Sequence, residues 1–204
     1  MQFRVIPVTP FQQNCSLLWC EQTLKAAVVD PGGDLDAIRA AIAKIGVVVE
    51  KILLTHGHID HAGGTAELRR VLGVPVEGPQ REESFWIEQL PQQSQMFGFP
   101  RAEAFVPDRW LEDGDAVTFG KITLEVIHTP GHTPGHVVFF NRASKIAVVG
   151  EGVVEQLMRR TAEEYGVTSV VVTHDMRSAF TVADRIAMLH QGTLRTVGTV
   201  AEIQ

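Results

Sequence analysis

The chain has 204 residues, a formal net charge of −6 and 45% hydrophobic residues, which suits one folded α/β domain with or without a small appendage. This composition excludes wholesale disorder, and the acidic balance argues against a nucleic-acid-binding protein. No apolar run approaches the ~18–20 residues of a membrane-spanning helix, so no membrane span is expected. The N-terminal segment does not read as a signal peptide, which makes the cytoplasm the expected compartment.

Short apolar segments alternate with helical patterns along the first 150 residues. Strands are predicted where apolar runs are bounded by Gly, Pro or Asp, at residues 4–8, 15–20, 25–30, 51–56, 74–78, 116–119, 121–128, 136–140 and 145–150. Apolar residues at helical spacing predict helices over 34–46, 62–73 and 81–90. Pro91 is expected to end the last of these helices, and residues 91–107 to be irregular. The alternation favours a mixed α/β fold.

The pattern changes near residue 150. A helix is predicted over 153–166, a strand over 167–174, a second helix over 175–187 and a hairpin over 188–199. We therefore expect two parts, residues 1–150 and residues 151–204.

The clearest chemical signal is the motif HGHIDH, directly after the predicted strand 51–56. Imidazole and carboxylate are the usual ligands of zinc and similar divalent ions. In an extended segment His56 and His58 point to the same side and can reach one ion. Asp60 and His61 follow where the chain turns into a helix, and can reach a second ion. A polar loop with surface histidines is the alternative, which the clustering disfavours.

A second motif, HTPGHTPGH, spans residues 128–136. Each proline fixes φ and each glycine allows a tight bend, so a rigid loop between two strands is predicted. Rigid loops suit the presentation of metal ligands. His132, between Gly131 and Thr133, is the best ligand candidate, and some of the other histidines in this loop are expected to hydrogen-bond to backbone.

Together these motifs resemble the metallo-β-lactamase superfamily, in its glyoxalase-II-like (hydroxyacylglutathione hydrolase-like) branch. The segments IPVTPFQQNCSLLWC, AAVVDPGGD, ILLTHGHIDHAGG and PDRWLEDGD carry the same resemblance, which covers about residues 1–150. It implies an αββα sandwich with the site at one edge, between the sheets. It also implies that one metal ion is held by His56, His58 and His132, and a second by Asp60 and His61. Asp30 is then either a residue beside the site or a turn-forming Asp before proline.

Two departures from the family pattern concern the end of the sandwich. Glu151 stands where the family has a bridging Asp, so it is either a displaced ligand or a solvated loop acid. The family's terminal His is missing, and the one strand-then-His candidate is His174. We therefore expect an atypical or incomplete C-terminal layer.

Residues 153–204 resemble the C-terminal end of an ABC transporter ATPase, in which His174 would be the switch-loop residue that senses the γ-phosphate. The chain has no phosphate-binding loop of the form G-x-x-x-x-G-K-S/T and no LSGGQ-type signature. An ABC transporter partner is therefore not expected. Alternatively, the segment replaces the missing last layer and completes the sandwich, with His174 near the second metal.

The resemblance implies a metal-dependent hydrolase with one or two divalent ions, zinc first, with iron and manganese also suited to these ligands. The expected reaction is hydrolysis of a small acylglutathione-type thioester by a metal-bound hydroxide, which Asp60 would help to orient. Two alternatives remain open. One is a metal-binding but catalytically degenerate protein, and the other is a fragment related to an ABC transporter ATPase without its own ATP site.

Overall fold

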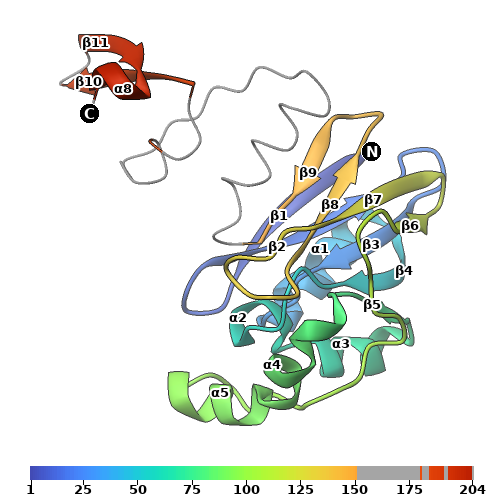
Figure 1. The fold of residues 1–204 in the computed structure, drawn as a ribbon. Helices are drawn as coiled ribbons and strands as arrows, with labels where there is room; N and C mark the ends of the chain where they lie inside the picture. The colour runs from blue at the N-terminus through green and yellow to red at the C-terminus, as the bar shows by residue number, and fades with distance from the viewer. Residues whose placement is uncertain (151–179, 181–183, 191–192, 204) are drawn as a thin grey trace. The chain divides into compact units, whose positions relative to one another are not determined.

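The computed structural model describes residues 1–150, 180, 184–190 and 193–203. It forms two compact units, Met1–Glu151 and Gly152–Gln204 (Figure 1). That these units are separate domains with the boundary expected from the sequence stays a prediction.

The first unit begins with a five-stranded sheet in the order β1-β2-β3-β4-β5. Its strands are β1 (Gln2–Val8), β2 (Gln13–Trp19), β3 (Lys25–Val29), β4 (Val48–Leu53) and β5 (Val76–Glu77). The first three pair antiparallel, whereas β3 with β4 and β4 with β5 pair parallel. Parallel neighbours need a crossover connection. Helix α1 (Leu35–Ile45) supplies the first, and helix α3 (Thr65–Leu72) lies in the second.

A second sheet of four antiparallel strands follows, in the order β6-β7-β8-β9. The strands are β6 (Ala116–Phe119), β7 (Ile122–His128), β8 (Val137–Asn141) and β9 (Ile146–Val148). The motif HTPGHTPGH therefore lies between two neighbouring strands, as the sequence predicts.

Two apolar clusters give the layers of the first unit. One cluster joins the two sheets, with Leu18, Val29 and Leu53 from the first sheet packed with Leu124 and Phe139 from the second. The other cluster joins the opposite face of the first sheet to the helices. The described residues thus form helix, sheet and sheet layers of an αββα sandwich.

The helical segments differ from the prediction at two places. The helix expected over 62–73 is two pieces, α2 (Ile59–Ala62) and α3. Pro91 was expected to end a helix and residues 91–107 to be irregular, but Pro91 lies in the first turn of α5 (Leu90–Phe97), so both predictions are wrong for residues 91–97. Proline is tolerated there because the first helical N–H groups have no partner inside the helix. Before α5 the chain forms a short 3₁₀ turn, η1 (Arg81–Glu83), and α4 (Ser84–Glu88).

The described part of the second unit is a hairpin and a short helix. Strands β10 (Arg185–His190) and β11 (Thr193–Thr199) pair antiparallel, followed by α8 (Val200–Ile203). The hairpin was predicted, although β10 begins inside the helix expected over 175–187. The elements predicted over 153–174 lie outside the described residues. Among the residues described, no helix has the length and apolar character needed to cross a bilayer.

Candidate metal centre

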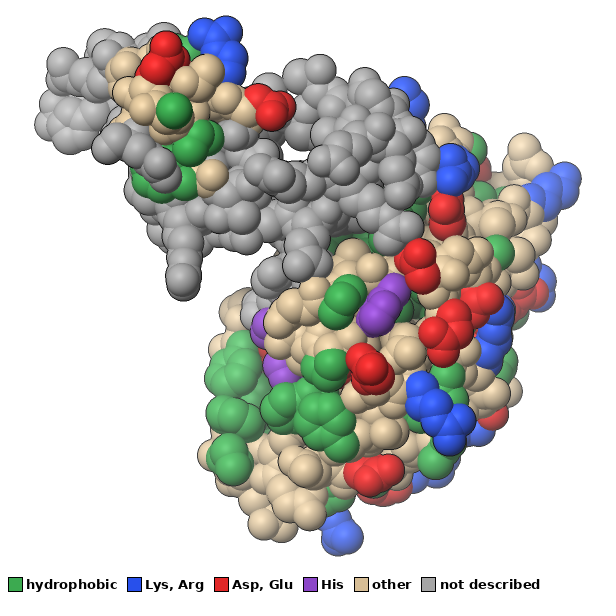
Figure 2. All heavy atoms as spheres, in the orientation of Figure 1, with side chains coloured by type: hydrophobic (Ala, Val, Ile, Leu, Met, Phe, Trp, Pro, Cys, Tyr) green, Lys and Arg blue, Asp and Glu red, His purple; other side chains and the backbone are tan. Residues whose placement is uncertain are grey.

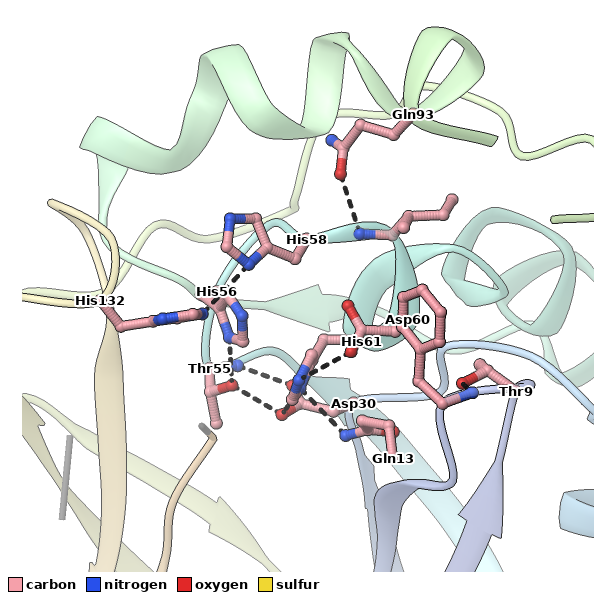
Figure 3. Close-up of polar contacts among 12 residues, drawn as sticks. Thr9, Gln13, Asp30, Thr55, His56, His58, Asp60, His61, Gln93 and His132 are labelled. Carbon is pink, nitrogen blue, oxygen red and sulfur yellow. Dashed lines mark hydrogen bonds and ion pairs between the residues drawn. The ribbon is translucent and has the colours of Figure 1, made fainter. Parts of the chain in front are cut away.

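The HGHIDH segment follows β4, the strand between β3 and β5 in the first sheet. The end of β4 and the residues after it are buried. His58, in extended conformation, precedes the first turn of α2, so the chain changes direction inside the motif. Gln93 of α5 holds this bend, because its side-chain oxygen accepts from the Ile59 N–H at 3.0 Å (Figure 3). This arrangement places the motif at the carboxyl end of a central, rigid strand.

Three imidazoles from two distant segments converge here. One nitrogen of each of His56, His58 and His132 lies within 4.8 Å of the others. His132 Nε2 faces His58 Nδ1 at 3.1 Å, although the two residues are 74 positions apart (Figure 3). His56 is fully buried, and its Nε2 has no hydrogen-bond partner among the residues that the structure describes. The structure thus brings together the three histidines that the resemblance assigned to one ion.

A second group shares His56 and adds Asp30 and His61, again with donor atoms within 4.8 Å of one another. The resemblance named Asp60 and His61 for this position. Asp60 lies beside the group, with Oδ2 3.6 Å from His61 Nε2. The two groups therefore meet at His56, and Asp60 and His61 belong to the same cluster.

Asp30 anchors this cluster from the end of β3. Its carboxylate accepts from the Thr55 N–H at 2.8 Å, from the Thr55 hydroxyl at 2.6 Å and from His61 Nδ1 at 3.0 Å. Gln13 also contacts His61 Nδ1, through its Nε2 at 2.9 Å. Because a carboxylate only accepts hydrogen bonds, the His61 Nδ1–H donates to Asp30, and Nε2 of His61 carries the lone pair. Of the two sequence interpretations of Asp30, the structure supports a residue beside the site.

The imidazoles of His56 and His58 are held in their neutral form. Burial, and then the neighbouring imidazoles, keep the pKa of His56 well below its ordinary value. Burial and His132 lower the pKa of His58 to about 4. Neutral imidazole is the form that binds metal ions, so these histidines are ready to bind at pH 7.

His136 is a buried neighbour that the sequence did not single out. Its ring centroid lies 5.0 Å from that of His56, and its Nδ1 contacts the Thr129 hydroxyl at 3.0 Å. A side chain at Gly150 would come within 2.7 Å of His136 Nε2 and of the Thr55 hydroxyl. The glycine thus leaves room for these side chains beside His56.

Two predicted residues cannot be placed. Glu151 and His174 both lie outside the residues that the structure describes. Their roles as ligands stay predictions.

The buried imidazoles predict how stability depends on pH. Burial lowers the pKa of His136 to about 3 from 6.5, with Asp30 opposing the shift. Below pH 6.5, His136 is protonated in the unfolded chain but stays neutral in the folded chain. The free energy of unfolding therefore falls as the pH is lowered toward 3. The contribution of His136 alone approaches about 1.4 kcal/mol per pH unit well below pH 6.5 and is roughly half of this between pH 7 and 6. Urea unfolding with a chelator at pH 7, 6 and 5 measures the slope, and His136→Asn, which can still bond to Thr129, should reduce it. An equal slope in the two proteins would contradict the prediction.

The chain matches a family model and several known proteins. The model of the metallo-β-lactamase superfamily matches residues 8–194. A hydroxyacylglutathione hydrolase, GloC, from Haemophilus influenzae is 35% identical over 200 residues, which are 97% of this chain and 94% of that protein. A hydroxyacylglutathione hydrolase of Bdellovibrio bacteriovorus is 35% identical over 138 residues, 66% of this chain and 46% of that protein.

Solved structures show the same fold. The B3 metallo-β-lactamase BLEG-1 aligns with a TM-score of 0.66 and 24% identity, covering 98% of this chain and 95% of that one. TTHA1623, crystallised in a di-iron-bound form, aligns with a TM-score of 0.63 and 22% identity, over 97% of this chain and 95% of that one.

These matches also bear on the C-terminal segment. The resemblance of residues 153–204 to an ABC transporter ATPase finds no support, since the family model continues to residue 194 and the Haemophilus influenzae relative covers 97% of the chain. The chain belongs to the metallo-β-lactamase superfamily and is a metallo-hydrolase.

Proposed function

We propose that this metal-dependent hydrolase cleaves small thioesters of the acylglutathione type. The observation that carries the proposal is the convergence of His56, His58 and His132 on one point, beside the group of Asp30, His56 and His61. The two relatives described as hydroxyacylglutathione hydrolases support the choice of substrate.

The residues present fit a divalent ion. Within the described part of the chain, His56 Nε2 is buried without a hydrogen-bond partner, which is costly for a polar atom unless something else binds there. His58 Nδ1 and His132 Nε2 face each other, as nitrogens that share a ligand would. We assign His56, His58 and His132 to one ion, and Asp60 and His61 to a second. The nitrogen and oxygen donors suit zinc, iron and manganese.

A bound divalent ion supplies a Lewis acid and brings the pKa of a bound water toward about 7. The chain's own residues then orient the reactants. Asp60, whose carboxylate lies beside His61, would accept a hydrogen bond from the attacking water and orient it. Asp30 fixes His61 through Nδ1, which leaves Nε2 for binding.

A thioester suits a site of this composition. The thiolate leaves without protonation by a strong acid, so the site does not need a dedicated general acid. His56 and His58 are neutral at pH 7 and would be poor proton donors, since burial lowers the pKa of both, that of His58 to about 4.

The surface beside the site is apolar on one side. The His58 ring contacts Trp86 at 4.6 Å between centroids, and Trp86 contacts Phe85, which is 40% exposed. Figure 2 shows histidine side chains at the surface next to a group of hydrophobic ones. This surface offers an apolar contact for part of the substrate.

Metal analysis and hydrolysis assays of the purified protein test the proposal. We expect about two ions per chain and release of free thiol from an acylglutathione, both lost after chelation and both restored by Zn²⁺, Fe²⁺ or Mn²⁺. The oxygen-ester analogue serves as the matched control substrate and should react more slowly. A metal-loaded protein that releases no thiol would contradict the thioester proposal. One ion without turnover would favour the catalytically degenerate alternative.

A further inference from the structure

A buried carboxylate links the two segments that carry the histidines. Glu83, at the end of η1, is 0% exposed. Its Oε2 accepts from the Gly57 N–H at 2.8 Å, and its Oε1 accepts from the Gly135 N–H at 2.8 Å. Gly57 lies between His56 and His58, whereas Gly135 lies three residues after His132. One side chain thus bridges both loops.

The local packing is built around this bridge. A Cβ at Gly57 would come within 2.7 Å of the Trp86 side chain, and a Cβ at Gly135 within 2.7 Å of Glu83 Cγ and 2.8 Å of the Gln80 carbonyl. Only residues without a side chain let the carboxylate approach both N–H groups. The Gln80 N–H also donates to the Gly135 carbonyl at 3.1 Å. Gly135, in the loop that carries His132, is thus hydrogen-bonded to both Gln80 and Glu83.

Burial of the Glu83 carboxylate costs free energy, and the hydrogen bonds that offset this cost join the two histidine segments. A carboxylate removed from water is strongly destabilising unless its oxygens are hydrogen-bonded. Glu83 meets this need with two charge-assisted bonds, which are shorter and stronger than neutral ones. Those bonds go to two segments 78 positions apart in the chain, Gly57 and Gly135, whose histidines must meet within a few tenths of an ångström to bind one ion.

We propose that Glu83 is a positioning residue that sets the separation of the His56–His58 and His132 segments, and thereby the affinity and geometry of the metal site. This inference rests on the proposed metal site. Both oxygens of Glu83 accept from backbone N–H groups, so Glu83 acts through the two loops and not as a ligand.

The test uses the full chain, stripped of metal and titrated with Co²⁺, whose visible absorption spectrum reports ligand geometry. Glu83→Gln keeps the size of the side chain but has one acceptor oxygen, so its NH₂ group opposes one of the two backbone N–H donors. We expect Co²⁺ affinity to fall about 10- to 100-fold, as for other residues that support ligands, with a changed spectrum. Glu88→Gln, at an exposed position of α4, is the matched control. Its Co²⁺ affinity and spectrum should be the same as those of the parent protein.

A second variant separates geometry from charge. Glu83→Asp keeps the charge, but it is one methylene too short to reach both loops, so its affinity should also fall. Restored affinity in Glu83→Asp would show that charge alone matters and would overturn the proposal. So would Glu83→Gln with affinity within about twofold of the parent and the same spectrum.

Folding and the proposed function are distinguished by two further measurements. The unfolding temperature of each metal-free variant shows whether the fold survives. If neither variant folds, Glu83 is a folding residue and the positioning role is rejected. If the parent protein binds no Co²⁺, both the proposed metal site and this inference are wrong. If the parent binds Co²⁺ and the Glu83 variants bind it with the same affinity, only this inference is wrong.

Discussion

His56→Gln is expected to abolish stable metal binding and to lower thioester hydrolysis by more than the roughly 10- to 100-fold typical of a supporting residue. His56 belongs to both groups of candidate ligands, and no other described residue forms a hydrogen bond with its buried Nε2. An amide oxygen is a poorer ligand than imidazole for zinc and iron. Metal content after gel filtration and the rate of thiol release measure the effect, and circular dichroism shows whether the variant is folded.

His128→Gln is the matched control for this experiment. His128 is the first histidine of the HTPGHTPGH motif but lies outside the cluster, with its Nε2 2.9 Å from the Pro134 carbonyl oxygen. Glutamine keeps a donor for that carbonyl, so metal content and activity should stay near those of the parent. A folded His56→Gln that retains the parent's metal would mean that the ion binds elsewhere.

The sequence was most informative where chemistry and spacing are local. The HGHIDH motif predicted the meeting of His56 and His58 because both lie on one extended segment after a buried strand. The joining of His132 to them was implied only by family resemblance, since nothing in its spacing fixes a partner 74 positions away. The strands of the first 150 residues were predicted well, because apolar runs between Gly, Pro and Asp are strong local signals.

The residues that hold the ligands in place could not be predicted in this way. Glu83 and Gln93 lie in a polar helical stretch, and their hydrogen bonds reach backbone groups 26 to 52 positions away. A buried Glu has no local signature, because only the fold decides whether it faces water. The prediction for Pro91 was wrong for a related reason. A proline can follow the end of one helix or stand in the first turn of the next, and the tertiary packing of α5 decides which of the two occurs.

Gly32→Ala is expected to destabilise the protein by about 3 kcal/mol or more, at or beyond the upper end of typical overpacking costs. An ideal Cβ at Gly32 would lie 1.5 Å from the Asp60 carbonyl oxygen, a distance at which two unbonded atoms cannot coexist. That carbonyl belongs to backbone rather than to a flexible side chain. The turn carrying Asp60 and His61 must therefore move, and metal content should fall together with stability.

Gly33→Ala provides the matched control one residue away. Its Cβ would meet only the Thr9 methyl group at 3.2 Å, which a small rotation relieves. Its effect on the free energy of unfolding should stay within about 1 kcal/mol, with metal content unchanged. Urea unfolding of the metal-free proteins compares the two alanines directly. Because the Gly64 N–H also donates to the Pro31 carbonyl at 2.9 Å, the turn after β3 and the helix after the histidines are packed backbone against backbone. Equal stability of the two variants would mean that this contact does not fix the position of Asp60 and His61.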